Sequence, residues 1–195
     1  MSDKDEKLTK RYSNKITNKL TREAIYTALV ILIKQKPFDS ITVTDIVKKA
    51  GVSRTAYYNN YNTKKDILND LVDSLIFEIN MELAPYTDLN TGKAKEPEIF
   101  IRTMFEVLYK QKDIYKILYE ANFNHVILDR LTESMQSQIL DRSDENMYQI
   151  AFNAGALYNV FSRWITNTEN NNIDEMTKIS LKMYYKPMSE KLEDW

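Results

Sequence analysis

The chain contains no cysteine and has little glycine, proline or histidine. The missing cysteine excludes disulfides and thiolate metal sites. With 3 Gly and 4 Pro among 195 residues, the chain is poor in the turn residues that a β fold requires. The single histidine, His125, excludes a multi-histidine metal site, so no metal is expected. We expect His125 to be an ordinary polar residue at a helix start, and a place in a ligand pocket is the alternative.

Long apolar runs and catalytic motifs are also missing. The longest apolar run, 28–33, is far too short to cross a membrane, and the charged segment 1–15 lacks the apolar core of a signal peptide. There is no glycine-rich phosphate loop and no G-x-S-x-G nucleophile elbow. We therefore expect a cytoplasmic protein that is not an enzyme, with no catalytic residues, no cofactor and no membrane partner.

Charge is distributed unevenly along the chain. Residues 1–65 contain 14 Lys and Arg against 6 Asp and Glu, a net charge of +8. Residues 66–195 contain 13 against 22, a net charge of −9. This asymmetry indicates a polyanionic partner for the N-terminal part only. We predict two domains: 1–65, a basic arm with a DNA-binding domain, and 66–195, a second helical domain.

Segment 41–67 has the features of a helix-turn-helix. Thr42 and Asp45 form a capping box at the start of one helix, and Gly51 is suited to end it. Ser53 is a good cap for a second helix over 54–60, and Thr63 begins another capping box. The second helix of such a unit fits the DNA major groove. The pattern alone fits an ordinary helical bundle equally well, and the positive charge of 1–65 favours DNA.

This region resembles the DNA-binding domain of TetR-family transcriptional regulators. The resemblance rests on Phe38-Asp39-Ser40-Ile41-Thr42-Val43, Asp45-Ile46, Ala50-Gly51-Val52-Ser53-Arg54, Tyr57-Tyr58, Tyr61 and Lys64. It implies that Arg54 contacts base edges and that Lys64 contacts a phosphate of double-stranded operator DNA. The DNA-contacting residues expected from it are Thr42, Thr44, Ser53, Arg54, Thr55, Tyr57, Tyr58, Asn60 and Lys64.

Helical periodicity continues through most of the remaining chain. We predict an all-α fold of about nine helices, in which an N-terminal three-helix domain with the helix-turn-helix precedes a C-terminal helical domain for ligand binding and dimerisation. The first 10–15 residues are polar and are expected to be mobile and to precede the first helix. Beyond the helix-turn-helix, the expected helices are 17–35, 64–83, 98–110, 112–121, 126–140, 145–167 and 173–192, with a linker at 85–97.

The last two predicted helices carry a looser resemblance, to TetR-family regulators of dihydroxyacetone-kinase operons. It rests on Ala151-Phe152-Asn153-Ala154-Gly155-Ala156-Leu157, Arg163-Trp164-Ile165 and Asp174-Glu175-Met176. In TetR-like chains the two C-terminal helices of each protomer pair in a homodimer, although such aromatic residues also suit an ordinary core. The interface residues expected from this are Gly155, Tyr158, Phe161, Trp164, Ile165, Ile179 and Met183.

The family resemblance also implies a small-molecule effector in the C-terminal domain. Candidate pocket residues, which an ordinary core would explain equally well, are Phe77, Phe100, Met104, Tyr109, Tyr115, Tyr119, Phe123, His125 and Tyr148. The function expected is that of a ligand-responsive repressor that binds a palindromic operator as a homodimer. The alternative is a TetR-like co-activator that acts through protein contacts without binding an operator.

Overall fold

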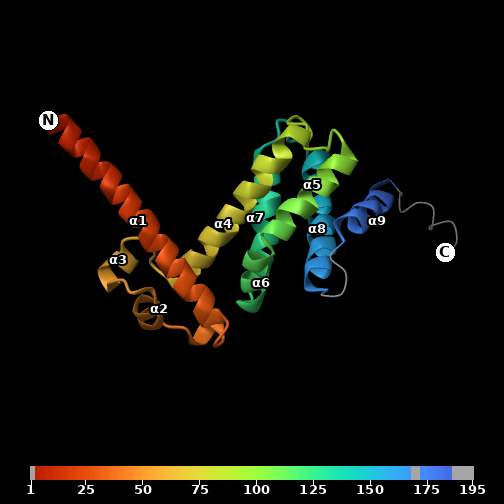
Figure 1. Cartoon of the computed structure of the whole chain (residues 1–195). Coiled ribbons are helices and arrows are strands. Elements are labelled where there is room, and N and C mark those ends of the chain that lie inside the picture. Colours follow the sequence, from red (N-terminus) through yellow and green to blue (C-terminus); the bar gives the residue numbers. More distant parts are fainter. Residues whose placement is uncertain (1–2, 168–171, 186–195) are drawn as a thin grey trace. The chain divides into compact units, whose positions relative to one another are not determined.

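The computed structural model describes residues 3–167 and 172–185, with side chains from residue 16 onward. Within these residues the regular structure consists of nine α-helices, two short 3-10 helices and one isolated β-bridge, which confirms the all-α prediction. The elements are α1 (Asp3–Ile33), η1 (Phe38–Ser40), α2 (Val43–Ala50), α3 (Arg54–Tyr58), α4 (Lys64–Leu83), η2 (Ala84–Tyr86), α5 (Pro97–Lys110), α6 (Lys112–Glu120), α7 (Asn124–Ser137), α8 (Asp144–Thr166) and α9 (Ile173–Tyr185) (Figure 1).

The chain divides into two compact units. The first comprises Met1–Leu71 together with Ile117–Phe123, and the second comprises Val72–Lys116 and Asn124–Trp195. The expected boundary at residue 65 is therefore displaced into the middle of α4. The physical reason is that α4 is one uninterrupted helix whose first turns bury Ile67 and Leu68 in the first unit.

In the first unit, α1 packs against α2 and α3. Its C-terminal half buries Ile25 and Leu29, and α2 buries Ile46. The helix begins at Asp3, earlier than expected, because no Gly or Pro precedes Pro37 and the polar start is rich in good helix formers. The expectation that the first 10–15 residues lie outside the helix was wrong for those from Asp3 onward.

In the second unit, α5 packs against α9 and α7 packs against α8. Aromatic pairs join α8 to α5 and to α6: the ring centroids of Phe105 and Trp164 are 5.1 Å apart, as are those of Tyr115 and Phe161. Among the helices of residues 3–167 and 172–185, none contains a segment with the length and hydropathy that a membrane span requires. Part of the last predicted helix, 186–192, lies outside the described residues.

The predicted linker is an ordered loop after α4. Thr87 and Ala94 form the isolated β-bridge, and the carboxylate of Asp88 accepts hydrogen bonds from the backbone N–H groups of Asn90 and Thr91 at 2.9 Å. The Leu140 N–H donates to the carbonyl oxygen of Leu89 in this loop at 3.0 Å. The loop is thereby fixed to the segment between α7 and α8.

Candidate nucleic-acid interface and ligand cavity

The helix-turn-helix has the caps that its sequence predicts. The Thr42 hydroxyl accepts a hydrogen bond from the Asp45 N–H at 3.1 Å, and the Asp45 carboxylate accepts one from the Thr42 N–H at 2.8 Å. Gly51 ends α2 in the left-handed conformation, with φ +67°. The Ser53 hydroxyl accepts from the Ala56 N–H at 3.0 Å and begins α3. These contacts confirm the predicted helix-turn-helix.

The exposed side of this unit carries hydrogen-bonding groups from both helices. Arg54 and Thr55 are exposed at the start of α3, and Tyr58 is 52% exposed at its end. The Arg54 guanidinium donates to the Thr44 hydroxyl at 2.5 Å, which links the beginnings of the two helices. Arg54 is thus held in place while its remaining N–H donors stay accessible to a partner.

Tyr57, Asn60, Thr42 and Ser53 have structural roles here. Tyr57 is 0% exposed, and burial raises the pKa of its hydroxyl to about 12. Its placement among the DNA-contacting residues was therefore wrong, because its side chain is part of the core. The Asn60 side chain donates to the carbonyl oxygen of Ala56 at 2.8 Å and is half-buried. Thr42 and Ser53 are exposed, but their hydroxyls accept the capping hydrogen bonds described above.

Lys64 is engaged inside the first unit. Its ammonium group donates to the carbonyl oxygens of Phe38 at 2.7 Å, Asp39 at 2.9 Å and Ile41 at 2.9 Å. The nitrogen also lies 4.6 Å from the centroid of the Phe38 ring. An ammonium group has three donors, and the three carbonyl oxygens use all of them. The structure thus corrects the expectation that Lys64 is held ready for a phosphate, because it joins the start of α4 to η1.

Arg22, Tyr61 and Asp70 form a second connection in this unit, and the sequence analysis missed it. The Tyr61 hydroxyl donates to the Asp70 carboxylate at 2.7 Å, and the Arg22 guanidinium pairs with the same carboxylate. The Arg22 guanidinium also lies 5.5 Å from the centre of the Tyr61 ring. The three groups join α1, α4 and the segment that follows α3. Arg22 and Asp70 are 48 positions apart, a separation that no local pattern reveals.

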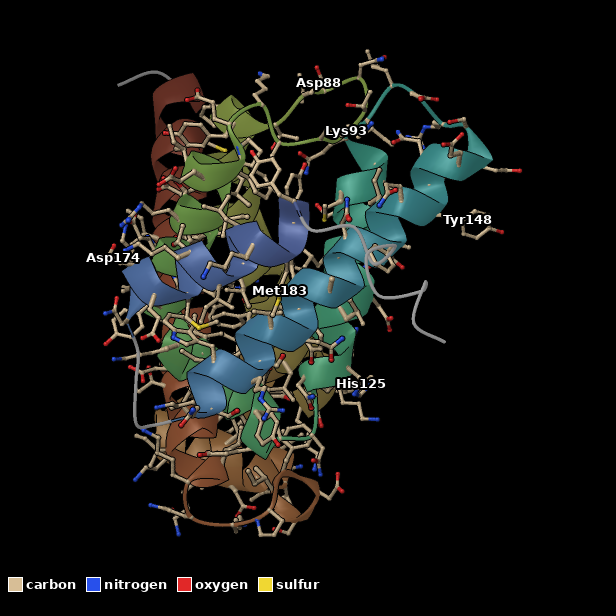
Figure 2. The ribbon with its side chains drawn as sticks, turned by 90° about the vertical axis from the view of Figure 1, so that its right-hand side faces the viewer. Asp88, Lys93, His125, Tyr148, Asp174 and Met183 are labelled. Atoms are coloured by element: carbon tan, nitrogen blue, oxygen red, sulfur yellow. The ribbon has the colours of Figure 1, made fainter. Side chains whose placement is uncertain are left out.

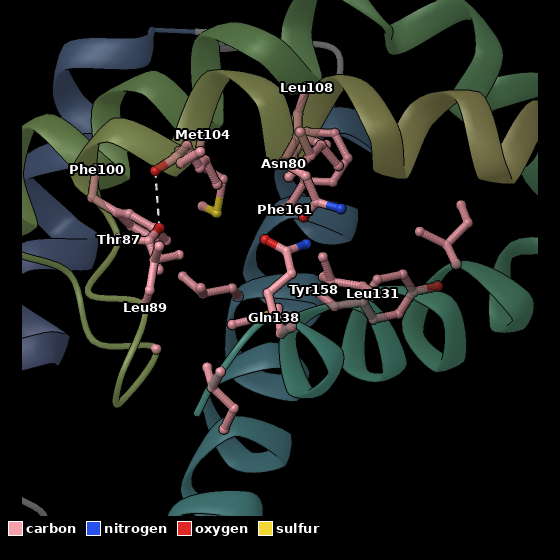
Figure 3. Close-up of a pocket in the computed structure, with 18 of the residues that line it drawn as sticks. Asn80, Thr87, Leu89, Phe100, Met104, Leu108, Leu131, Gln138, Tyr158 and Phe161 are labelled. Carbon is pink, nitrogen blue, oxygen red and sulfur yellow. Dashed lines mark hydrogen bonds between the residues drawn. The ribbon is translucent and has the colours of Figure 1, made fainter. Parts of the chain in front are cut away.

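The second unit contains a cavity among α4, α5, α6, α7 and α8 (Figure 3). The cavity and its opening to solvent together have a volume of about 900 Å³. None of the described residues that line it is charged. The residues that line the cavity are Ile79, Asn80, Leu83, Ala84, Thr87, Leu89, Gly92, Phe100, Met104, Leu108, Tyr115, Ile127, Leu131, Met135, Gln138, Ile139, Leu157, Tyr158 and Phe161.

Three of the nine candidate pocket residues line this cavity, namely Phe100, Met104 and Tyr115. Two other lining residues, Tyr158 and Phe161, were expected at the dimer interface. Six candidates lie elsewhere, which corrects their assignment to the pocket. Phe77, Tyr119 and Tyr148 are 64%, 51% and 77% exposed, His125 is exposed, and Tyr109 and Phe123 are half-buried away from the cavity wall.

The candidate interface residues fall into two groups. Phe161, Trp164 and Ile165 are 3%, 4% and 3% exposed, so these three pack inside the second unit rather than on its surface. They were expected at the dimer interface, but within the protomer their side chains lie on the inner, aromatic face of α8. By contrast, Met183 on α9 is 62% exposed, and a Cβ built on Gly155 would meet nothing within 4 Å.

The face formed by α8 and α9 carries further exposed apolar groups. Figure 2 shows the two helices turned toward the viewer, with Met183 near the middle and Tyr148 projecting at one edge. Phe152 is 62% exposed and Ile179 is 36% exposed. The sequence analysis did not select Phe152 for the interface, although its spacing of three from Gly155 places both residues on one side of the helix.

Comparisons with known proteins agree with this architecture. Residues 25–71 match the family model described as bacterial regulatory proteins, tetR family. The chain is 26% identical over 110 residues to an uncharacterized HTH-type transcriptional regulator of Bacillus subtilis, YxbF, a match that covers 56% of this chain and 29% of that protein. It is 20% identical over 152 residues to the transposon Tn10 TetC protein of Escherichia coli, covering 75% of this chain and 77% of that protein.

A solved structure shows the same fold over nearly the whole chain. The TetR transcriptional regulator from Streptococcus agalactiae superposes with a TM-score of 0.63 at 16% identity, covering 89% of this chain and 98% of that one. The family model covers the helix-turn-helix, whose caps and turn are described above. Residues 25–71 thus match the tetR family model in sequence, and the chain as a whole is similar in fold to that TetR regulator.

Proposed function

We propose that this protein is a transcriptional repressor that binds a palindromic operator as a homodimer and responds to a small molecule in its cavity. The observation that carries the proposal is the exposed surface of α3, where Arg54 is held by Thr44 and flanked by Thr55 and Tyr58. A rigid frame with accessible donors suits the reading of base edges in a major groove.

Basic residues next to this surface support contact with the phosphate backbone. Lys48 and Lys49 lie in the last turn of α2 and are both exposed. Lysines in such positions neutralise phosphates and release counterions, which makes binding depend on salt concentration. With Lys64 engaged internally, Lys48 and Lys49 are the lysines that we assign to the phosphates.

Two-fold symmetry is the second part of the proposal. A palindromic operator requires two recognition helices at a fixed spacing, which a symmetric dimer provides. The exposed apolar residues of α8 and α9, including Phe152, Ile179 and Met183, form a surface that a second copy would cover. Gly155, which has open space in front of it, would allow a close approach of the partner helix.

Helix α4 connects the two proposed activities because its residues belong to both units. Lys64 and Asp70 attach its first turns to the helix-turn-helix unit, whereas Ile79, Asn80 and Leu83 line the cavity. A ligand that contacts the later turns can therefore bias the position of the whole helix. The two recognition helices would then no longer match successive major grooves, and affinity for the operator would fall.

Selection of bound duplexes from a random DNA pool by the purified full chain tests this function. We expect enrichment of a palindrome, with an affinity that falls steeply as the salt concentration rises. Arg54→Ala should cost about 1–3 kcal/mol and relax the preference at one base pair of each half-site. Failure to enrich any duplex from a folded, dimeric protein would refute operator binding and favour a regulator that acts through protein contacts.

A further inference from the structure

We propose that the cavity binds an uncharged, mainly apolar molecule whose single polar group resembles a carboxamide and contacts Asn80 and Gln138. The inference rests on the proposed function only in so far as that function makes the cavity an effector site. It concerns the chemical class of the ligand, which can be measured without DNA.

The absence of charge on the cavity wall argues against an ionic ligand. The described lining residues include no Asp, Glu, Lys, Arg or His. Met104, Ile127 and Phe161 are 5%, 4% and 3% exposed, so this part of the wall is apolar and shielded from bulk solvent, whereas Gln138 is exposed. A charged group placed there would lose its hydration and find no counter-charge, whereas an apolar group would be stabilised.

Three of the polar lining residues direct their hydroxyl hydrogens toward protein partners. The Tyr115 hydroxyl donates to the Ser162 hydroxyl at 2.6 Å, and the Tyr158 hydroxyl donates to the carbonyl oxygen of Asn124 at 2.9 Å. The Thr87 hydroxyl donates to the carbonyl oxygen of Leu83 at 2.9 Å (Figure 3). These side chains therefore contribute mainly ring faces and methyl groups to ligand binding.

Asn80 and Gln138 are the remaining polar lining residues, and they form one cluster with Ser134. The amide nitrogens of Asn80 and Gln138 both donate to the Ser134 hydroxyl oxygen, at 2.6 Å and 3.2 Å. Figure 3 shows the two amide groups close to each other. Each primary amide has two N–H donors and a carbonyl acceptor, so after one hydrogen bond to Ser134 each side chain still has an N–H donor and its carbonyl oxygen for a ligand.

A carboxamide matches this pair because it offers donors and an acceptor in one plane. Its N–H groups can donate to an amide oxygen of the protein, and its oxygen can accept from an amide N–H. An alcohol offers fewer hydrogen bonds, a carboxylate offers no donor, and an ammonium group offers no acceptor. The order of affinity expected for one apolar tail is therefore carboxamide first, alcohol second and the two ions last.

Four probes with the same tail test this order: octanamide, 1-octanol, octanoate and octylammonium. At about pH 7 the last two are charged. Isothermal titration calorimetry on the full chain without DNA should show octanamide binding at least about tenfold more tightly than either ion. Octanoate or octylammonium binding as tightly as octanamide would overturn the proposal, and so would failure of octanamide to bind the folded protein.

Two substitutions of Asn80 separate recognition from simple damage to the cavity. Asn80→Leu should abolish the preference for octanamide over 1-octanol while binding of 1-octanol persists. Asn80→Asp, which preserves shape and adds a negative charge, should raise the affinity ratio of octylammonium to octanamide by about tenfold or more. Unchanged ratios in both variants would refute the role of Asn80.

Gln138 has a matched control in Gln111. Gln111 lies in the same unit and donates to the Glu78 carboxylate at 3.2 Å, away from the cavity wall. Gln138→Leu should weaken octanamide binding several-fold, and Gln111→Leu should leave it unchanged. Equal effects of the two substitutions would count against the proposal. Selective octanamide binding combined with no effect on operator affinity would support the ligand class and refute the regulatory function instead.

Discussion

Removing the Lys64 side chain should loosen the helix-turn-helix without removing a DNA contact. Its ammonium group makes three hydrogen bonds to carbonyl oxygens of 38–41 and stacks over an aromatic ring. Hydrogen bonds to a charged group contribute roughly 1.5–3 kcal/mol each when shielded, and Lys64 is only half-buried. We therefore expect Lys64→Ala to cost about 2 kcal/mol in total. Exchange of the backbone amides of 38–60 should accelerate on the order of 30-fold.

Lys65 supplies a matched control, because it is the next residue of α4, carries the same charge and is exposed. Lys65→Ala should leave exchange of 38–60 unchanged. For Lys64→Ala, the slope of log affinity against log salt should equal that of the unaltered protein even if affinity falls. Lys64→Arg, whose planar group cannot direct three donors at these carbonyl oxygens, should also accelerate exchange. A slope lowered by about one with unchanged exchange would refute the internal role and restore Lys64 as a phosphate contact.

Four further substitutions test other parts of the structure. Hydrogen bonds from Lys36 and Thr42 hold the pKa of Asp45 below its usual value. The ionised Asp45 carboxylate therefore stabilises the folded state above about pH 4, and this stabilisation is lost as the pH falls further. Asp45→Asn should flatten the dependence of the unfolding free energy on pH, measured in a series of denaturation curves. Gly51→Ala should cost about 1 kcal/mol because of the positive φ, measured by urea unfolding. Trp164→Ala should destabilise the second unit by about 3–5 kcal/mol in the same assay. Phe152→Glu should leave the protomer folded but shift sedimentation toward monomer, and an unshifted dimer would remove Phe152 from the interface.

Local signals in the sequence were sufficient for the helix-turn-helix. The caps at Thr42 and Ser53 and the turn at Gly51 depend on residues within four positions of one another, so their geometry follows directly from residue types and spacing. Helical periodicity also located the later helices to within a few residues. The extension of α1 to Asp3 was missed because the periodic apolar signal weakens there, although nothing in 3–16 breaks a helix.

Local sequence patterns could not predict the contacts between residues that are far apart in the chain. The bond from Lys64 to the carbonyl oxygen of Phe38 spans 26 positions, and the pairing of Arg22 with Asp70 spans 48. Whether a lysine beside a recognition helix faces outward or bonds inward depends on where the chain places carbonyl oxygens in space. Sequence similarity to a family suggests the contacts of that family, and only the three-dimensional arrangement shows that these donors are already occupied.

Helix α8 shows why apolar spacing alone could not separate its surface residues from its core residues. The helix has two apolar sides: Phe161 and Trp164 face the interior of the unit, whereas Tyr148 and Phe152 are exposed. An amphipathic helix on the surface of a monomer has one apolar stripe, and a second, exposed stripe suits the partner helix of the proposed dimer. The aromatic content of α8 thus correctly indicated extensive packing but could not distinguish the two sides. The exposed side, which continues onto α9 at Met183, is therefore where substitutions should separate dimerisation from folding.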